Sequence, residues 1–167
     1  MKLILSNVVL CTPWERVEKA SVEIQYDRIY RISSGNTKAG EGLGGMLLAP
    51  GLIDTHMHGC AGIGVTYADV DELRELAKIL PQYGVTAFVP TLLTAPHKDL
   101  LRACTVVAKA QRLQKENLNG ARILGIHLEG PYLNPERSGA QNTRWLYLPN
   151  AREFQKYWRA SKAPYAS

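Results

Sequence analysis

The sequence predicts an α/β protein in which a small β module precedes repeated strand–helix units. Three features of the 167 residues support this: short β-like runs fill residues 1–49, apolar runs alternate with helical patterns after residue 50, and the strands of that second part begin about 35 residues apart. This rhythm is typical of βα units that build a parallel sheet or barrel. A closed (β/α)8 barrel needs roughly 250 residues, so we expect a partial TIM barrel of three units. The predicted domains are residues 1–49 and 50–167.

The β module is predicted from three runs rich in β-formers and separated by turn residues. The first run could be mistaken for a signal peptide, but Ser6 and Asn7 interrupt it and no small-X-small cleavage site follows. A glycine-rich link, Gly40–Gly45, leads out of the module. The three runs are Leu3–Leu10, Ser21–Gln25 and Ile29–Ile32.

After residue 50 the helices are predicted from their caps and their apolar spacing. Asp69 can cap a helix, with Glu72 completing a capping box, and this helix ends near Gly84. A second helix is expected after Thr94, and Asn150 is placed to cap a third. The expected strands are residues 50–59, 85–90 and 123–128, and the expected loop is 130–149.

Composition excludes several classes of function. The formal charge is +5, but the basic residues are dispersed, which argues against nucleic-acid binding and suits an anionic small substrate. No apolar run approaches the ~20 residues that span a bilayer. Three widely spaced cysteines without a CxxC pair indicate reduced thiols and a cytoplasmic protein.

The apolar run at residues 50–59 ends in a His-X-His pattern. On a strand, His56 and His58 point to one face, about 7 Å apart along the chain. Two imidazoles in this arrangement can bind one divalent ion. The alternative is a pair of neutral imidazoles that are hydrogen-bonded in a crowded core.

A second candidate ligand, Glu129, ends the third predicted strand just before a Gly-Pro turn. The carboxyl ends of parallel strands hold the chemistry of α/β barrels, so Glu129 can join the two histidines at one metal. Alternatively, backbone amides satisfy its carboxylate. His127 and Asp54 are interpreted as supporting or structural residues, and His97 as a surface residue.

Three stretches resemble known families. Pro50 to Gly59, Pro-Gly-Leu-Ile-Asp-Thr-His-Met-His-Gly, resembles the first barrel strand of the metal-dependent amidohydrolase superfamily. His127 to Asn142, with its Leu-Glu-Gly-Pro-Tyr-Leu-Asn-Pro run, resembles the N-acetylglucosamine-6-phosphate deacetylase family, as does the stretch from Gly84 to Leu92. The resemblance extends to about residue 160 and covers only the N-terminal 40% or so of a family member.

This resemblance implies a TIM barrel with a small β-sandwich built from both chain ends, of which residues 1–49 form part. It implies an amide hydrolase of amino-sugar catabolism that uses Zn or Fe to remove an acetyl group from an amino-sugar phosphate. His56, His58 and Glu129 match metal-binding positions, and Ala140 and Gln141 match substrate-binding positions. Many members have His where Gln141 stands. A homodimer is the assembly that the family implies.

The sequence departs from the family where proton transfer is concerned. The family uses an aspartate as general base and two further histidines, all late in the barrel, whereas no His or Asp follows Glu129 here. We therefore expect a partial metal site and an inactive chain when these 167 residues stand alone. The alternatives are a non-catalytic remnant that binds metal or sugar phosphate, and another amidohydrolase of the dihydroorotase or dipeptidase type. The unpaired edge of an open sheet also predicts aggregation or dimerisation.

Overall fold

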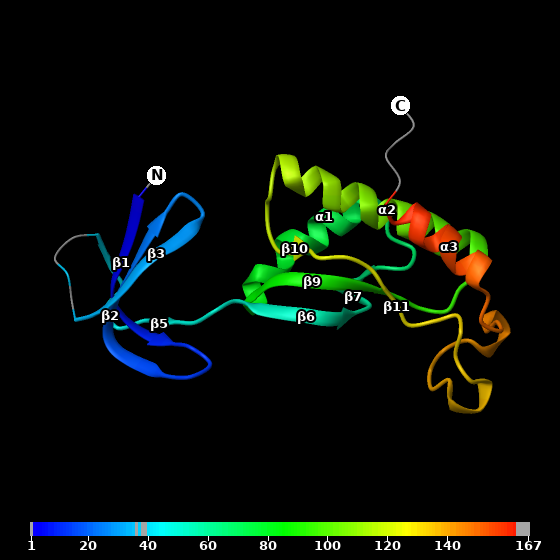
Figure 1. Ribbon diagram of the computed structural model, residues 1–167, viewed down its shortest axis with the longest axis horizontal. Coiled ribbons are helices and arrows are strands. Elements are labelled where there is room, and N and C mark those ends of the chain that lie inside the picture. Colours follow the sequence, from blue (N-terminus) through cyan, green and yellow to red (C-terminus); the bar gives the residue numbers. More distant parts are fainter. Residues whose placement is uncertain (1, 36, 38–39, 163–167) are drawn as a thin grey trace. The chain divides into compact units, whose positions relative to one another are not determined.

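A computed structural model describes residues 2–35, 37 and 40–162 of the chain (Figure 1). The chain divides into two compact units, Met1–Pro50 and Gly51–Ser167, which are described separately below. Among the described residues, no helix has the length and apolar character required to cross a membrane.

The first unit is a β-sheet built on an antiparallel meander. Strands β1 (Lys2–Cys11), β2 (Arg16–Gln25) and β3 (Arg28–Ser34) pair in the order β3-β2-β1. Two short strands, β4 (Glu41–Gly42) and β5 (Leu47–Leu48), pair parallel to β1. Alternate apolar side chains fill its core, which consists of Val8, Leu10, Ala20 and Val22.

The glycine-rich link predicted at Gly40–Gly45 contains a short strand, β4, that the sequence analysis did not predict. Gly40 has a φ of +91°, and a Cβ at this position would lie 2.4 Å from the carbonyl oxygen of Ile4. The glycine therefore allows the backbone to approach β1 closely enough to pair. A two-residue strand without an apolar pattern gives no periodic signal.

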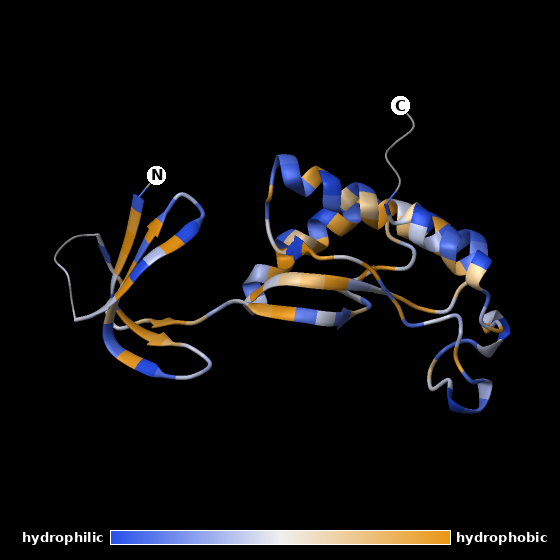
Figure 2. Cartoon of the chain, viewed as in Figure 1, coloured by the Kyte–Doolittle hydropathy of each residue, from blue (hydrophilic) through white to orange (hydrophobic). Residues whose placement is uncertain are grey.

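The sheet of the second unit is parallel, with β9 (Val85–Leu92) at its centre. Strand β6 (Leu52–Met57) pairs with one edge of β9, and β10 (Arg122–Ile123) and β11 (His127–Leu128) pair with the other. The strands are thus arranged in their chain order, and their carboxyl ends lie at the same edge of the sheet. Figure 2 shows that β6 is hydrophobic where it begins and largely hydrophilic further along.

The third strand is not continuous, contrary to the prediction for residues 123–128. Arg122 lies opposite Ala87, and His127 lies opposite Thr91. Five steps along this strand therefore match four steps along β9, so one extra residue is accommodated at 124–126. The ladder is interrupted there, as at a β-bulge.

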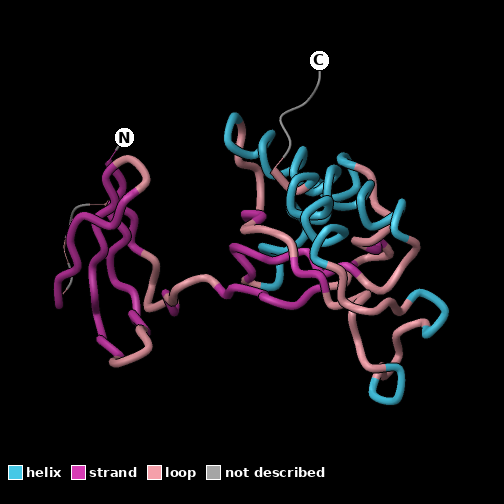
Figure 3. The backbone as a smooth tube through the Cα atoms, turned by 45° about the vertical axis from the view of Figure 1, so that its right-hand side comes forward, coloured by secondary structure: helices cyan, strands magenta, loops and turns pink. Residues whose placement is uncertain are grey.

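Three α-helices cover one side of this sheet (Figures 1 and 3). They are α1 (Val70–Ile79), α2 (His97–Glu116) and α3 (Ala151–Ala160). The predicted capping box is confirmed, since Asp69 and Glu72 exchange side-chain to backbone hydrogen bonds of 2.9 and 2.8 Å. The predicted cap of α3 is confirmed as well. The short 3-10 helices are η1 (Leu80–Tyr83), η2 (Pro135–Arg137) and η3 (Thr143–Trp145).

The hydrophobic core of the second unit lies between the helices and β9. Leu73, Phe88 and Leu100 are completely buried in it. By contrast, Leu52 and Ile53 on β6 are 62% and 60% exposed. Parallel sheets are normally covered on both faces, so β6 presents an apolar surface that this unit leaves uncovered.

We expect Gln114→Leu to destabilise the second unit by about 1–3 kcal/mol. The Gln114 side-chain amide donates to the Ala121 carbonyl at 2.8 Å, and its Oε1 accepts from the Ile123 N–H at 2.9 Å. Leucine would leave both buried backbone groups without a partner. Urea unfolding, followed by the circular dichroism of the helices, measures this loss. The matched control is Gln82→Leu at an exposed position, and equal stability of the two variants would contradict the prediction.

Cys104 is expected to resist alkylation in the folded protein. Burial raises the pKa of its thiol to about 11, so near pH 8 almost none of it is the reactive thiolate. Cys11 and Cys60 are only partly buried and should react first with iodoacetamide. Mass spectrometry of digests, with and without urea, tests this order. Rapid labelling of Cys104 in the native chain would show that α2 does not pack as described.

Candidate metal centre

The first candidate ligand, His56, lies near the carboxyl end of β6. The Asp54 carboxylate accepts a hydrogen bond of 3.0 Å from the backbone N–H of His56. The next residue, Met57, donates its N–H to the Thr91 hydroxyl on β9 at 3.0 Å. Contacts on both sides of His56 therefore fix the backbone that carries its imidazole.

His58 follows β6 directly and is oriented by the central strand. Its Nδ1 lies 3.1 Å from the carbonyl oxygen of Thr91. A proton on Nδ1 can be donated to this oxygen, which leaves the lone pair of the neutral ring on Nε2. This is the tautomer that a metal ligand requires, and a backbone carbonyl is a common partner for the other ring nitrogen.

A small hairpin turns the chain away immediately after His58. It consists of β7 (Gly59–Cys60) and β8 (Ile63–Gly64). Gly59 has a φ of +149°, and a Cβ at this residue would lie 2.0 Å from the carbonyl oxygen of Ile63. A side chain at position 59 would therefore clash with the hairpin, which the sequence alone did not predict.

The carboxylate comes from the opposite edge of β9. The Glu129 N–H donates to the Leu92 carbonyl at 3.2 Å, which extends the pairing of β11 by one residue. Gly130 then packs closely on Thr94, since a Cβ at this glycine would lie 2.1 Å from the threonine methyl group. Glu129 Oε2 is buried, and the described polar groups beside it are the imidazole Nε2 atoms of His58 and His56. A buried carboxylate oxygen of this kind requires a cation or a donor.

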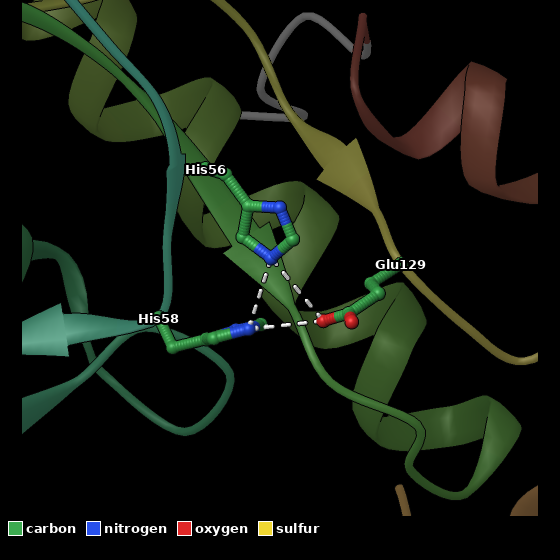
Figure 4. Close-up of side chains that lie close together, drawn as sticks. All are labelled: His56, His58 and Glu129. Carbon is green, nitrogen blue, oxygen red and sulfur yellow. Dashed lines mark hydrogen bonds and ion pairs between the residues drawn. The ribbon is translucent and has the colours of Figure 1, made fainter. Parts of the chain in front are cut away.

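The three side chains converge on one point, as Figure 4 shows. The two Nε2 atoms of His56 and His58 are 3.2 Å apart, and Glu129 Oε2 lies 3.5 and 2.9 Å from them, respectively. Ligands about 2.0–2.1 Å from a tetrahedral metal are about 3.3 Å from one another. Among the residues that the structure describes, His56, His58 and Glu129 are the group of His, Cys, Asp or Glu side chains whose potential ligand atoms lie close enough together to bind one ion. The donor set and its spacing therefore fit a divalent metal.

Thr91 supports this cluster, although its sequence context indicates this role only weakly. It is fully buried at the carboxyl end of an apolar strand, and its hydroxyl lies 3.3 Å from Nδ1 of His127. The His127 ring packs edge-on against the ring of His56, with centroids 5.0 Å apart. His127 was predicted to be a supporting or a structural residue, and its contact with the ring of His56 agrees with the supporting role. A polar residue at the carboxyl end of an apolar strand is the signal that could have identified Thr91.

The two predicted substrate-binding residues lie in the loop that follows Glu129. Ala140 is exposed, whereas Gln141 is 9% exposed. Gln141 Oε1 accepts hydrogen bonds from the backbone N–H and the hydroxyl of Thr94, at 2.8 and 2.9 Å. This oxygen therefore fastens the loop to the segment after β9, and substrate contact by either residue stays a prediction.

His97, predicted to be a surface residue, is only partly exposed. Its side chain is 30% exposed, and Nδ1 lies 2.8 Å from the hydroxyl of buried Tyr157. Tyr157 comes from α3, 60 residues later in the chain, and no local pattern links the two residues.

No protein-family model matches the chain, but individual proteins do. The N-acetylglucosamine-6-phosphate deacetylase of Bacillus subtilis is 29% identical over 160 residues, which cover 93% of this chain and 40% of that protein. The enzyme of the same name from Vibrio furnissii is 43% identical over 104 residues, which cover 62% of this chain and 25% of that protein.

Solved structures give the same result. The N-acetyl-D-glucosamine-6-phosphate deacetylase of Mycobacterium smegmatis, in complex with N-acetyl-D-glucosamine-6-phosphate, superimposes with a TM-score of 0.83 at 31% identity. The match covers 96% of this chain and 41% of that structure. The resemblance predicted from the motifs is thus confirmed over most of the chain, which spans at most about 40% of the length of these relatives.

We expect the chain to bind one Zn²⁺ ion, and His58→Ala or Glu129→Gln to weaken binding by more than about 100-fold. Loss of a ligand should exceed the 10–100-fold effect of losing a ligand's outer partner. Competition with a chromophoric chelator measures the affinity. Glu136→Gln, an exposed carboxylate in the same loop, is the matched control. Equal affinity of all variants would place the metal elsewhere.

Proposed function

We propose that this chain is the metal-binding, N-terminal part of an amide hydrolase of the N-acetylglucosamine-6-phosphate deacetylase type. The observation that carries the proposal is the convergence of His56, His58 and Glu129 at one edge of a parallel sheet. Relatives that match this chain over most of its length carry the name of that activity. The proposed substrate is an N-acetyl amino-sugar phosphate.

The proposed architecture is the beginning of a TIM barrel. Strands β6, β9 and the pair β10 and β11 are parallel and lie in chain order, with all three helices packed on one side. This is the arrangement of the first three βα units of a barrel. The first unit, a meander with two short parallel strands, would be part of the accompanying β-sandwich.

The proposed metal is Zn²⁺ or Fe²⁺, held by Nε2 of His56, Nε2 of His58 and Oε2 of Glu129. When bound, such an ion activates water and polarises a carbonyl oxygen. The protein's own part is to present the lone pairs: the Thr91 carbonyl holds the Nδ1 side of His58, and β9 holds the strands on both sides. The formal charge of +5 suits a phosphorylated substrate.

Proton transfer requires groups that these residues do not supply. Amide hydrolysis needs a general base for the water and an acid for the leaving amine. No His or Asp follows Glu129 in the sequence, and the relatives extend well beyond the matched region. The complete reaction therefore depends on polypeptide equivalent to that remaining length. We include a cytoplasmic location in the same proposal, because the three cysteines are unpaired. A homodimer, the assembly that the family resemblance implies, is also part of it.

The 167 residues alone should not deacetylate N-acetylglucosamine 6-phosphate, whereas a chimera should. In the chimera, residues 1–160 precede the part of the M. smegmatis enzyme that follows the matched region. Glu129→Gln in this chimera should lower kcat/KM by more than about 100-fold, because a catalytic metal contributes several kcal/mol. Release of acetate is the measurement.

Glu136→Gln in the same chimera is the control and should keep its activity. Zinc analysis and circular dichroism establish that each chimera is loaded and folded. A folded, zinc-loaded chimera without deacetylase activity would favour the alternative of a non-catalytic remnant. Activity of the 167-residue chain by itself would refute the assignment of proton transfer to the remaining polypeptide.

A further inference from the structure

A polar cluster outside the metal centre joins three segments of the second unit. It contains His97 at the start of α2, Tyr132 in the loop after Glu129, and Glu153 and Tyr157 on α3. Tyr132 donates to Glu153 Oε1 at 2.9 Å, and the Tyr157 hydroxyl lies 3.4 Å from the same oxygen and 2.8 Å from His97 Nδ1. Glu153 Oε2 lies 3.7 Å from His97 Nδ1.

One arrangement of protons satisfies all four side chains. His97 donates from Nδ1 to the Tyr157 oxygen, and both tyrosine hydroxyls donate to the Glu153 carboxylate. Burial, together with the charge of Glu153, raises the pKa of Tyr132 and of Tyr157 above the usual value, so both keep the protons that they donate. A partly buried network in which each side chain has a partner favours a single arrangement of its segments.

The cluster bears on Glu129 because Tyr132 is only three residues further along the chain. Residues 130–149 form a long loop with two short 3-10 turns as its regular structure. Within it the Tyr147 N–H donates to the Pro131 carbonyl at 3.0 Å, and side-chain contacts fasten the loop to the helices and to the segment after β9. Gln141 provides one anchor through its bonds to Thr94. The second anchor is the bond from Tyr132 to Glu153, on the side where the loop leaves Glu129.

We propose that Tyr132 and Glu153 are positioning residues for the metal ligand Glu129. By fastening the start of the loop to α3, they keep Oε2 of Glu129 within 3.5 Å of the imidazole nitrogens of His56 and His58. This proposal rests on the metal centre of the proposed function, but the anchoring of the loop can be measured without a metal.

The test uses the full chain with Tyr132→Phe, Glu153→Leu and the double variant. Each single variant should weaken Zn²⁺ binding by roughly tenfold, as does the loss of a partner that orients a ligand. The double variant should be little worse than either one, because both changes remove the same bond. Amide hydrogen exchange should become faster in residues 129–147 and stay unchanged in β6 and α1.

Two controls separate positioning from general destabilisation. Tyr83→Phe and Glu136→Leu make the same changes at exposed positions and should alter neither readout. Tyr132→Phe removes a single oxygen atom and keeps the ring packed, so it remains informative if Glu153→Leu does not fold.

Unchanged zinc affinity and unchanged loop exchange in Tyr132→Phe would overturn the proposal, as would multiplicative effects in the double variant. If the unmodified chain binds no Zn²⁺, the metal centre itself is refuted. In that case the exchange of residues 129–147 decides whether the loop is anchored in this way.

Discussion

The candidate metal centre depends on the carboxyl end of β9. This strand pairs with β6 on one edge and with β11 on the other, and Thr91 lies between them. Its hydroxyl contacts the Met57 N–H and the His127 ring, and its carbonyl oxygen contacts the His58 ring. A single buried residue therefore sets the spacing of the segments that carry the ligands. Without this central strand, His58 and Glu129 would be only two residues that lie 71 positions apart in the sequence.

The geometry of the cluster carries chemical information of its own. Two imidazole nitrogens and one carboxylate oxygen lie within 3.5 Å of one another, and that oxygen is buried. This spacing and this donor set are those of ligands around one divalent cation. The convergence is thus a stronger indication of metal binding than the presence of two histidines in the sequence.

The chemistry of amide hydrolysis has two parts, metal binding and proton transfer, and the described residues bear on the first. The described residues hold three candidate metal ligands, together with the contacts that orient them. The relatives extend well beyond the region that matches this chain, and in the proposed function that length supplies the acid and the base. The exposed apolar residues of β6, such as Leu52 and Ile53, are consistent with a sheet that continues into further structure.

Local patterns determined much of this protein in advance. Residues only a few positions apart determine the capping box of Asp69 and Glu72, the cap at Asn150 and the alternation of strands and helices. The two-residue repeat of a strand likewise predicts that both histidines of the His-X-His pattern point to one face. The extra residue at 124–126 and the contact between His97 and Tyr157 depend on which distant segments become neighbours, so only the tertiary structure decided them. Thr91 illustrates the same limit, because its role is set by its partners on β6 and β11, more than 30 residues away in either direction.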